Sequence, residues 1–235
     1  MIFEKLCTEA FDERNISKDI HEMNDHIKGL LANAPPSHEI PFEVLQDIRR
    51  KGGGLLAFQP YSEKAENMEI NYSNHKVMIR IFNHDSPDFV YLHIHGGGHC
   101  IGAADMQDQS LEKISNDLNC VVVSVEYRLA PANPYPAAPD DCEAAAIWLI
   151  ENSKSQFNTE KIVIGGESAG ANLSAVTLQR LKSKGLLDNV KGANLIYGSY
   201  DARLTPSTLR QQGSDEIFLL SYEMIRKFRD SYFQG

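Results

Sequence analysis

This chain has little of several features that mark other classes of protein. Its four cysteines include no C-x-x-C pair, and it has no run of 18 apolar residues. Scattered cysteines of this kind indicate reduced core thiols of a cytosolic protein. The missing apolar run predicts no membrane span, and the alternation of polar and apolar residues over 1–15 predicts no signal peptide. We therefore expect a cytoplasmic protein.

Basic residues are also in the minority. The chain has 23 Lys and Arg against 32 Asp and Glu, which gives a formal net charge of −9 at pH 7. This balance argues against a nucleic-acid partner, which would need clustered basic side chains. The length of 235 residues and the apolar content of 42% are sufficient for one α/β domain with a sizeable core.

Histidine is missing from the whole second half of the chain. All eight histidines precede residue 100, and the last is His99. Histidine is the side chain that most often serves as a general base in catalysis. Any nucleophile in the later part of the sequence therefore lacks a histidine downstream of it.

Apolar periodicity predicts strands that alternate with helices. Helices are expected at 17–33, 41–51, 104–118, 140–152, 169–184 and 216–231. Strands are expected at 68–72, 76–82, 89–94, 120–125, 161–165 and 192–197. The first two strands indicate a hairpin at a sheet edge. The later ones predict a parallel sheet with right-handed crossovers.

The segment Gly166-Glu167-Ser168-Ala169-Gly170 has the G-x-S-x-G spacing of a serine nucleophile. It lies between a predicted strand and a predicted helix, which is the context of a sharp nucleophile elbow. Such a turn strains the backbone of the serine, and side chains at the glycine positions would collide with neighbouring backbone. Ser168 is therefore the predicted nucleophile, and Gly166, Glu167 and Gly170 shape its turn.

A second motif, His95-Gly96-Gly97-Gly98, follows the strand predicted at 89–94. Consecutive glycines leave backbone N–H groups free to face a ligand, as an oxyanion hole requires. The N–H of Ala169, at a helix N-terminus, would supply a third donor. One donor of this kind is worth about 10²–10³ in rate.

Two other interpretations of these glycines can be weighed. Gly96, Gly98 and Gly102 approximate a dinucleotide-binding fingerprint, with Glu126 at the end of the next strand. The third glycine is one residue late, however, and this interpretation leaves the serine elbow unexplained. An ordinary glycine loop would be the preferred interpretation if the elbow were absent.

A metal site is a further alternative, since His93, His95 and His99 lie close together in sequence. No carboxylate or cysteine joins them at ligand spacing. We therefore expect no metal, a core position for His93 and a loop-bracing position for His95.

Three blocks of the chain together resemble the hormone-sensitive-lipase family of α/β-hydrolases, the bacterial family IV esterases. Residues 95–98 match its HGGG signature, residues 127–131 its YRLAP segment, and residues 166–170 its GDSAG segment with Glu in place of Asp. The blocks occur in family order within 88–200. The resemblance implies an α/β-hydrolase fold whose mostly parallel sheet has helices on both faces. It also implies hydrolysis of short-chain acyl esters without cofactor or metal.

The resemblance implies a role for each matching residue. The implied site comprises the nucleophile Ser168, the oxyanion donors Gly97, Gly98 and Ala169, the loop-shaping His95 and Gly96, and His99 in the acyl pocket. It also implies three segments: an N-terminal helical cap at 1–55, a partial hydrolase core at 56–204 and a cap-like helical segment at 205–235. Asp140 and Asp141 are interpreted as caps of their helix.

The family pattern breaks after Ser168. The triad order in this fold is Ser, then Asp or Glu, then His, and no histidine follows Ser168. Asp201 follows the strand at 192–197, but the family takes its acid from a later strand, so Asp201 is interpreted as a loop residue. Loss of a triad base costs about 10⁶ in kcat. We therefore expect a chain truncated at its C-terminus and inactive or very weak.

The missing last strands would leave residues 193–197 as a bare apolar sheet edge, which invites pairing with a second copy. The expected partners are thus a small acyl ester and, through this edge, another copy of the chain. The alternative function is a hydrolase-derived protein without catalysis that binds a small acidic or ester ligand. The intact elbow serine favours the esterase.

Overall fold

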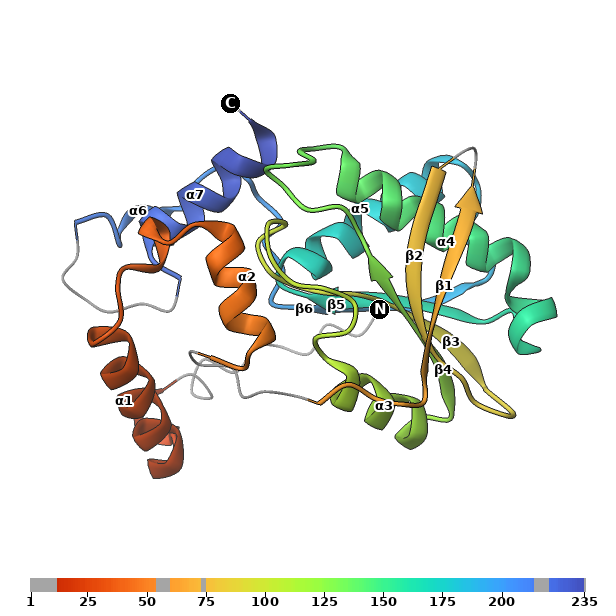
Figure 1. The fold of residues 1–235 in the computed structure, drawn as a ribbon, viewed down its shortest axis with the longest axis horizontal. Helices are drawn as coiled ribbons and strands as arrows, with labels where there is room; N and C mark the ends of the chain where they lie inside the picture. The colour runs from red at the N-terminus through yellow and green to blue at the C-terminus, as the bar shows by residue number, and fades with distance from the viewer. Residues whose placement is uncertain (1–11, 54–59, 73–74, 214–219, 235) are drawn as a thin grey trace.

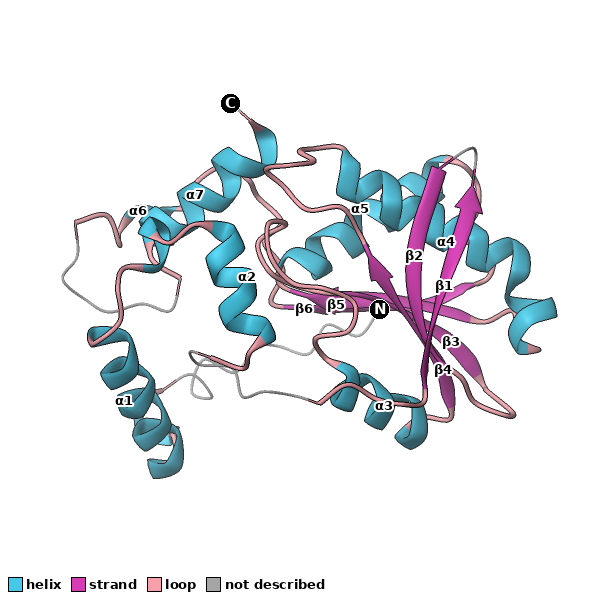
Figure 2. Ribbon diagram, viewed as in Figure 1, coloured by secondary structure: helices cyan, strands magenta, loops and turns pink. Residues whose placement is uncertain are grey.

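The computed structural model describes residues 12–53, 60–72, 75–213 and 220–234. Their strands form a six-stranded sheet in the order β1-β2-β4-β3-β5-β6, with helices on both faces (Figures 1 and 2). The strands are β1 (Ala65–Tyr72), β2 (His75–Phe82), β3 (Phe89–Ile94), β4 (Cys120–Glu126), β5 (Ile162–Glu167) and β6 (Val190–Ile196). Pairs β1–β2 and β2–β4 are antiparallel, and the remaining pairs are parallel. The sheet is therefore mostly parallel with an antiparallel hairpin at one edge, as predicted.

The predicted helices also have counterparts in the structure. They are α1 (Lys18–Ala32), α2 (Phe42–Arg50), α3 (Asp108–Asp117), α4 (Ala137–Phe157), α5 (Ala169–Ser183) and α7 (Tyr222–Phe233). Shorter turns were not predicted: η2 (Glu13–Asn15), η3 (Ser37–Glu39) and α6 (Pro206–Leu209). Part of the helix predicted at 216–231 lies outside the described residues. In Figure 1, α2 and α7 lie side by side although they come from opposite ends of the chain.

Helices α3 and α4 differ from the prediction, and α4 does so at both ends, since it ends at Phe157 rather than 152. Helix α3 begins at Asp108 rather than 104, because residues before it form a turn in which the Ala104 N–H donates to Glu126 Oε2 at 2.6 Å. Helix α4 begins at Ala137, ahead of the expected start at 140. The predicted capping role of Asp141 is therefore wrong. Asp141 is buried inside the helix, and its carboxylate accepts the Arg128 N–H at 2.7 Å.

Strand β4 lies at the centre of the core. Val121, Val123 and Val125 pack in the large cluster that includes side chains of α4 and α5. Cys120 and Val122 face the opposite side, in a smaller cluster with Leu111 of α3. A strand buried on both faces reads as a continuous apolar run, which is why the sequence located it well.

Cysteine placement agrees with the expectation of reduced core thiols. Cys100, Cys120 and Cys142 are buried and free, and Cys7 lies outside the described residues. Burial raises the pKa of the Cys100 thiol to about 12. These three thiols therefore stay protonated at neutral pH and act as small apolar groups.

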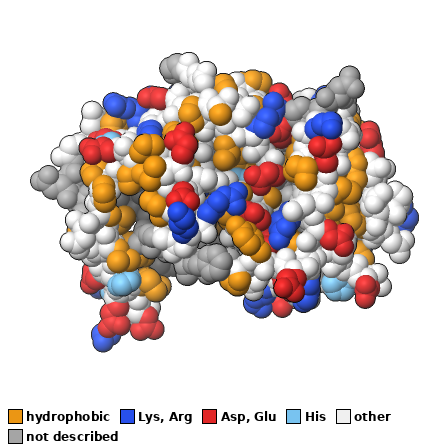
Figure 3. All heavy atoms as spheres, in the orientation of Figure 1, with side chains coloured by type: hydrophobic (Ala, Val, Ile, Leu, Met, Phe, Trp, Pro, Cys, Tyr) orange, Lys and Arg blue, Asp and Glu red, His pale blue; other side chains and the backbone are white. Residues whose placement is uncertain are grey.

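The two ends of the sheet differ. On β1, Glu66, Asn67 and Glu69 are mixed with apolar residues, whereas β6 exposes Leu195 by 40% and Ile196 by 41%. This exposure agrees with the predicted apolar edge. Of the helices described, none combines the length and apolar character that a bilayer crossing needs. On the face shown in Figure 3, basic side chains are interspersed with acidic ones.

Candidate active site

Ser168 lies in the sharp turn between β5 and α5. Its backbone adopts φ 55° and ψ −119°, a conformation that costs a non-glycine residue about 1–3 kcal/mol. A Cβ at Gly166 would lie 1.9 Å from the Ile94 carbonyl oxygen, and one at Gly170 would lie 1.8 Å from the same atom. Both positions therefore exclude any side chain, and the strand-to-helix turn presses directly against the end of β3.

The glycine loop begins where β3 ends. Gly97 has φ +127° and Gly98 has φ +60°, and a Cβ at Gly97 would lie 1.8 Å from the Ile101 carbonyl oxygen. The loop closes on itself, since the Cys100 and Ile101 N–H groups donate to the Gly97 oxygen at 3.1 and 3.0 Å. Within the described part of the chain, no hydrogen bond occupies the N–H of Gly97 or Gly98. These two donors remain available to a ligand.

The elbow and the glycine loop meet at Gly96. A Cβ at this position would lie 2.9 Å from the Glu167 carbonyl oxygen and 3.3 Å from Ser168 Cβ. Only a glycine lets the loop approach the serine this closely. The structure thus brings together the two motifs that the sequence singled out.

Glu167 links this junction to its surroundings. Its carboxylate accepts the Gly96 N–H at 2.6 Å and Gln107 Nε2 at 2.6 Å, and Oε2 lies 3.2 Å from His93 Nε2. Burial would raise the pKa of this carboxyl, but the hydrogen bonds from His93, Gly96 and Gln107 outweigh burial and lower the pKa to about 2. Glu167 is therefore an anion that fixes the loop against the elbow. The sequence signalled its position only as the variable residue of G-x-S-x-G.

His95 lies beneath the loop and is buried. Its ring stacks on Tyr127 with centroids 4.1 Å apart, and Nδ1–H donates to the Gly96 oxygen at 2.9 Å. Tyr127 Oη donates to the His95 oxygen at 2.8 Å. Burial lowers the pKa of His95 to about 4, so the ring is neutral at pH 7. This geometry fits the expected bracing role, and among the described residues no hydrogen bond joins His95 to Ser168.

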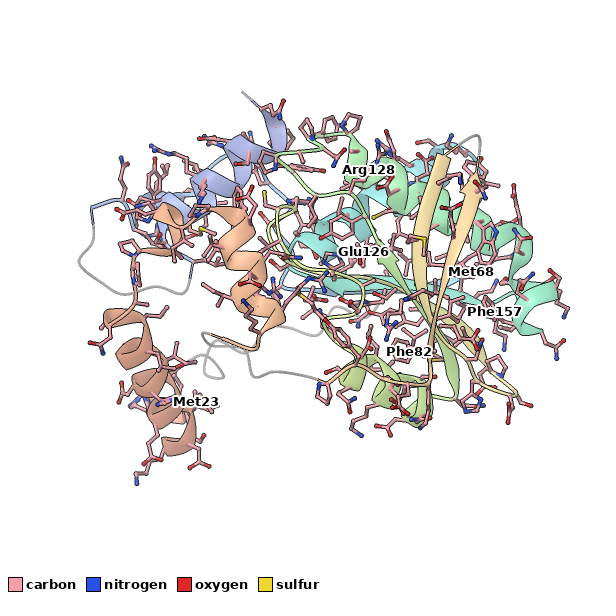
Figure 4. The ribbon with its side chains drawn as sticks, viewed as in Figure 1. Met23, Met68, Phe82, Glu126, Arg128 and Phe157 are labelled. Atoms are coloured by element: carbon pink, nitrogen blue, oxygen red, sulfur yellow. The ribbon has the colours of Figure 1, made fainter. Side chains whose placement is uncertain are left out.

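The segment that follows Tyr127 is tied to α4. Arg128, labelled in Figure 4, pairs with Asp141, and its Nη2 lies 2.8 Å from Asp141 Oδ1. Glu126, labelled in the same figure, is half-buried, and burial raises the pKa of its carboxyl. Because its Oε2 accepts the Ala104 N–H, Glu126 supports the chain behind the glycine loop.

His99 also has partners other than Ser168. Its ring stacks on Tyr232 of α7 with centroids 4.0 Å apart, and Nε2 lies 3.3 Å from Asn172 Oδ1. Burial lowers its pKa to about 4. Asn172 is one helical turn beyond Ser168, since its N–H donates to the Ser168 oxygen at 3.2 Å. His99 therefore lies beside the elbow, facing α7.

Helices α2 and α7 cover the glycine loop. The Phe228 ring would lie 2.4 Å from a Cβ at Gly98, and it stacks on Phe42 with centroids 5.6 Å apart. The Gln46 side chain donates to the Gly102 oxygen at 2.8 Å and accepts the Gly102 N–H at 2.7 Å. Sequence reasoning missed these contacts, because nothing in the pattern of an amphipathic helix shows which distant loop it meets.

The Ser168 hydroxyl has no hydrogen-bonded base in the part of the chain that the structure describes. Among the described residues, no histidine or carboxylate hydrogen-bonds its Oγ. Asp201 is exposed and pairs with Arg203 at 2.8 Å, in agreement with a loop residue.

The chain is similar in sequence to proteins named as esterases. The arylesterase of Saccharolobus solfataricus is 34% identical over 139 residues, which cover 56% of this chain and 45% of that protein. A probable carboxylesterase 6 of Arabidopsis thaliana is 33% identical over 138 residues, covering 55% of this chain and 41% of its own length. The chain therefore spans less than half of each of these relatives.

A solved structure shows the same fold. The hyperthermophilic esterase from the archaeon Pyrobaculum calidifontis superposes with a TM-score of 0.77 at 24% identity, over 94% of this chain and 71% of that one. The sequence profile described as alpha/beta hydrolase fold matches residues 91–235, which include the glycine loop, the elbow and α7. The chain belongs to the alpha/beta hydrolase fold family.

Proposed function

We propose that this chain is a carboxylic-ester hydrolase that acts on short-chain acyl esters through Ser168. Ser168 Oγ attacks the ester carbonyl carbon, and the N–H groups of Gly97, Gly98 and Ala169 hold the oxyanion that develops. The alcohol then leaves, and water releases the acid from the acylated serine. The relatives named as an arylesterase and a carboxylesterase support this reaction class.

The contact between elbow and loop is the observation that carries the proposal. Glu167 and Gly96 are 71 positions apart in sequence, yet they are joined by a 2.6 Å hydrogen bond. This bond holds the start of the glycine loop against the residue that precedes Ser168 before any ligand binds. Donors fixed beforehand stabilise the charge of a transition state without reorganisation.

Weak turnover by this chain is part of the proposal. His93 and His95 are buried and engaged, and His99 faces Asn172. A serine hydroxyl without a base is a poor nucleophile, and the loop donors with binding alone leave about 10³–10⁴ in rate over water. We therefore expect slow acylation by activated reagents and little hydrolysis.

Active-site labelling tests the proposal. The chain is incubated with an alkyl fluorophosphonate, and mass spectrometry locates the adduct, with Ser168→Ala as the control. We expect a slow adduct on Ser168 alone and no measurable turnover of p-nitrophenyl butyrate. The absence of a Ser168 adduct would refute the esterase proposal. Rapid turnover that Ser168→Ala removes would instead refute the weak-activity part.

A second candidate is a binding protein without catalysis, which is favoured because no described residue hydrogen-bonds the Ser168 hydroxyl. This candidate predicts saturable binding of a small acid or ester by a well-folded chain, with no adduct on Ser168. The labelling experiment and a binding titration therefore separate the two functions.

A further inference from the structure

Helix α2 presents three side chains to the region of the glycine loop. Phe42, Gln46 and Arg49 are spaced by four and three residues, so they share one face of the helix. Phe42 stacks on Phe228, and Gln46 makes its two hydrogen bonds with Gly102. These contacts hold α2 in a fixed position across the loop.

Arg49 is the member of this face that has no hydrogen bond or ion pair with a described residue. Its Nη1 lies 3.2 Å from the position that a Cβ of Gly97 would occupy, and its Nε is buried without a hydrogen bond. Among the described residues, its guanidinium makes no hydrogen bond or ion pair. The adjacent Arg50, in contrast, points to Asp105 at 3.4 Å and to Tyr61.

Among the described residues, no carboxylate forms an ion pair with Arg49. Burial lowers the pKa of Arg49, while Tyr127 and Glu167 oppose that effect. Glu167 already accepts hydrogen bonds from donors on both of its oxygens. A cation withdrawn from water without a partner destabilises the fold, and an incoming anion would relieve that cost.

We propose that Arg49 binds the carboxylate of the substrate, so that the substrate class is acyl esters with a free carboxylate, such as half-esters of short dicarboxylic acids. This inference rests on the proposed function. The planar guanidinium matches a carboxylate through two parallel hydrogen bonds. Arg49 lies against Gly97, and the neighbouring Gly96 touches Ser168. Adjacent Cα atoms are about 3.8 Å apart, so only a few bonds would separate the carboxylate from the scissile ester.

A binding titration in the Ser168→Ala background tests this proposal without requiring turnover. Monomethyl succinate and dimethyl succinate are titrated by calorimetry into four chains: the background itself and its Arg49→Gln, Arg49→Lys and Arg50→Gln variants. Arg50→Gln removes the same charge from the same helix away from the loop, and thermal melts verify folding. We expect the monoester to bind more tightly than the diester, and more weakly as salt rises.

We expect Arg49→Gln to weaken monoester binding by about 10- to 100-fold, since charge-assisted hydrogen bonds contribute about 1.5–3 kcal/mol. Arg49→Lys should lose part of the affinity, and Arg50→Gln should lose none. Equal binding of both esters, no binding of either, or the same affinity in Arg49→Gln would overturn the proposal. Phosphonate labelling of Ser168 reports separately on the esterase. If Ser168 is labelled but the chain binds both esters equally, only the role of Arg49 is refuted. If the chain prefers the monoester but Ser168 is not labelled, only the esterase function is refuted.

Discussion

The two sides of Ser168 differ in how closely they are packed and in their hydrogen bonds. On the side of the glycine loop, Gly96, Gly97 and Gly98 leave no room for a Cβ. The Glu167 carboxylate fixes the junction of loop and elbow with three hydrogen bonds. Towards β6, the Ser168 N–H donates to the Ile196 oxygen at 2.9 Å, but the chain beyond is exposed, with Tyr197 77% exposed. The side of Ser168 that faces the glycine loop is thus closely packed and hydrogen-bonded. On the β6 side, no described histidine or carboxylate hydrogen-bonds the Ser168 hydroxyl.

The largest expected effect is on the free energy of unfolding, when a glycine on each side of Ser168 is replaced by valine. Gly170→Val would place a Cβ 1.8 Å from the Ile94 oxygen, and we expect the free energy of unfolding to fall by about 3 kcal/mol or more. Gly192→Val on β6 meets no atom within 4 Å and should change it by at most about 0.5 kcal/mol. Urea denaturation followed by circular dichroism measures both. Similar losses would contradict the contrast.

A second contrast concerns two acids with the same lowered pKa. The pKa of Glu167 falls to about 2 in the folded chain, against about 4.3 unfolded, so its stabilisation is present above pH 4.3 and is lost as the pH falls towards 2. By this linkage, Glu167→Gln should remove about 3 kcal/mol of pH-dependent stability. Asp201 also has a pKa of about 2, set by Arg203, but it is exposed. Asp201→Asn should therefore leave the pH profile of unfolding unchanged. If the free energy of unfolding depended on pH in the same way in Glu167→Gln and Asp201→Asn, Glu167 would not fix the loop.

Strain at the elbow gives a smaller effect. Ser168→Gly relieves the positive φ of 55°, and we expect unfolding to cost about 1 kcal/mol more than in the native chain. Ser168→Ala keeps a Cβ and should bring no such gain. Thermal melts of the two variants measure the difference. Equal stabilities would mean that the turn stores no strain.

The smallest expected effect lies on the β6 side. Leu195→Lys places a charge on the exposed edge, and self-association measured by sedimentation velocity should fall while unfolding changes by at most about 0.5 kcal/mol. Glu69→Lys on β1, at the opposite edge of the sheet, is the matched control and should leave association unchanged. Association that persists in Leu195→Lys would exclude this edge as the contact between copies.

Much of the fold could be predicted from the sequence, because the residue patterns that indicate its strands and helices are local. The strand expected at 89–94 is β3, and the helix expected at 169–184 is α5 within one residue. Predicted helix boundaries were wrong where a residue far away in sequence forms a hydrogen bond with the segment. Residues 104–107 were expected to be helical, but the Ala104 N–H is captured by Glu126, 22 positions away. Local periodicity carries no information about such a partner.

The sequence by itself determined the elbow and the glycine loop, because glycine spacing and strand ends specify turns that only a few residue types can adopt. The tertiary structure alone decided that Glu167 joins the two motifs, that Gln46 and Arg49 cover the loop, and that no described base reaches Ser168. Gln46 and Gly102 are 56 positions apart, and Gln107 and Glu167 are 60 apart. Contacts at such separations depend on how the sheet and its helices pack, and the pattern of neighbouring residues does not encode that packing.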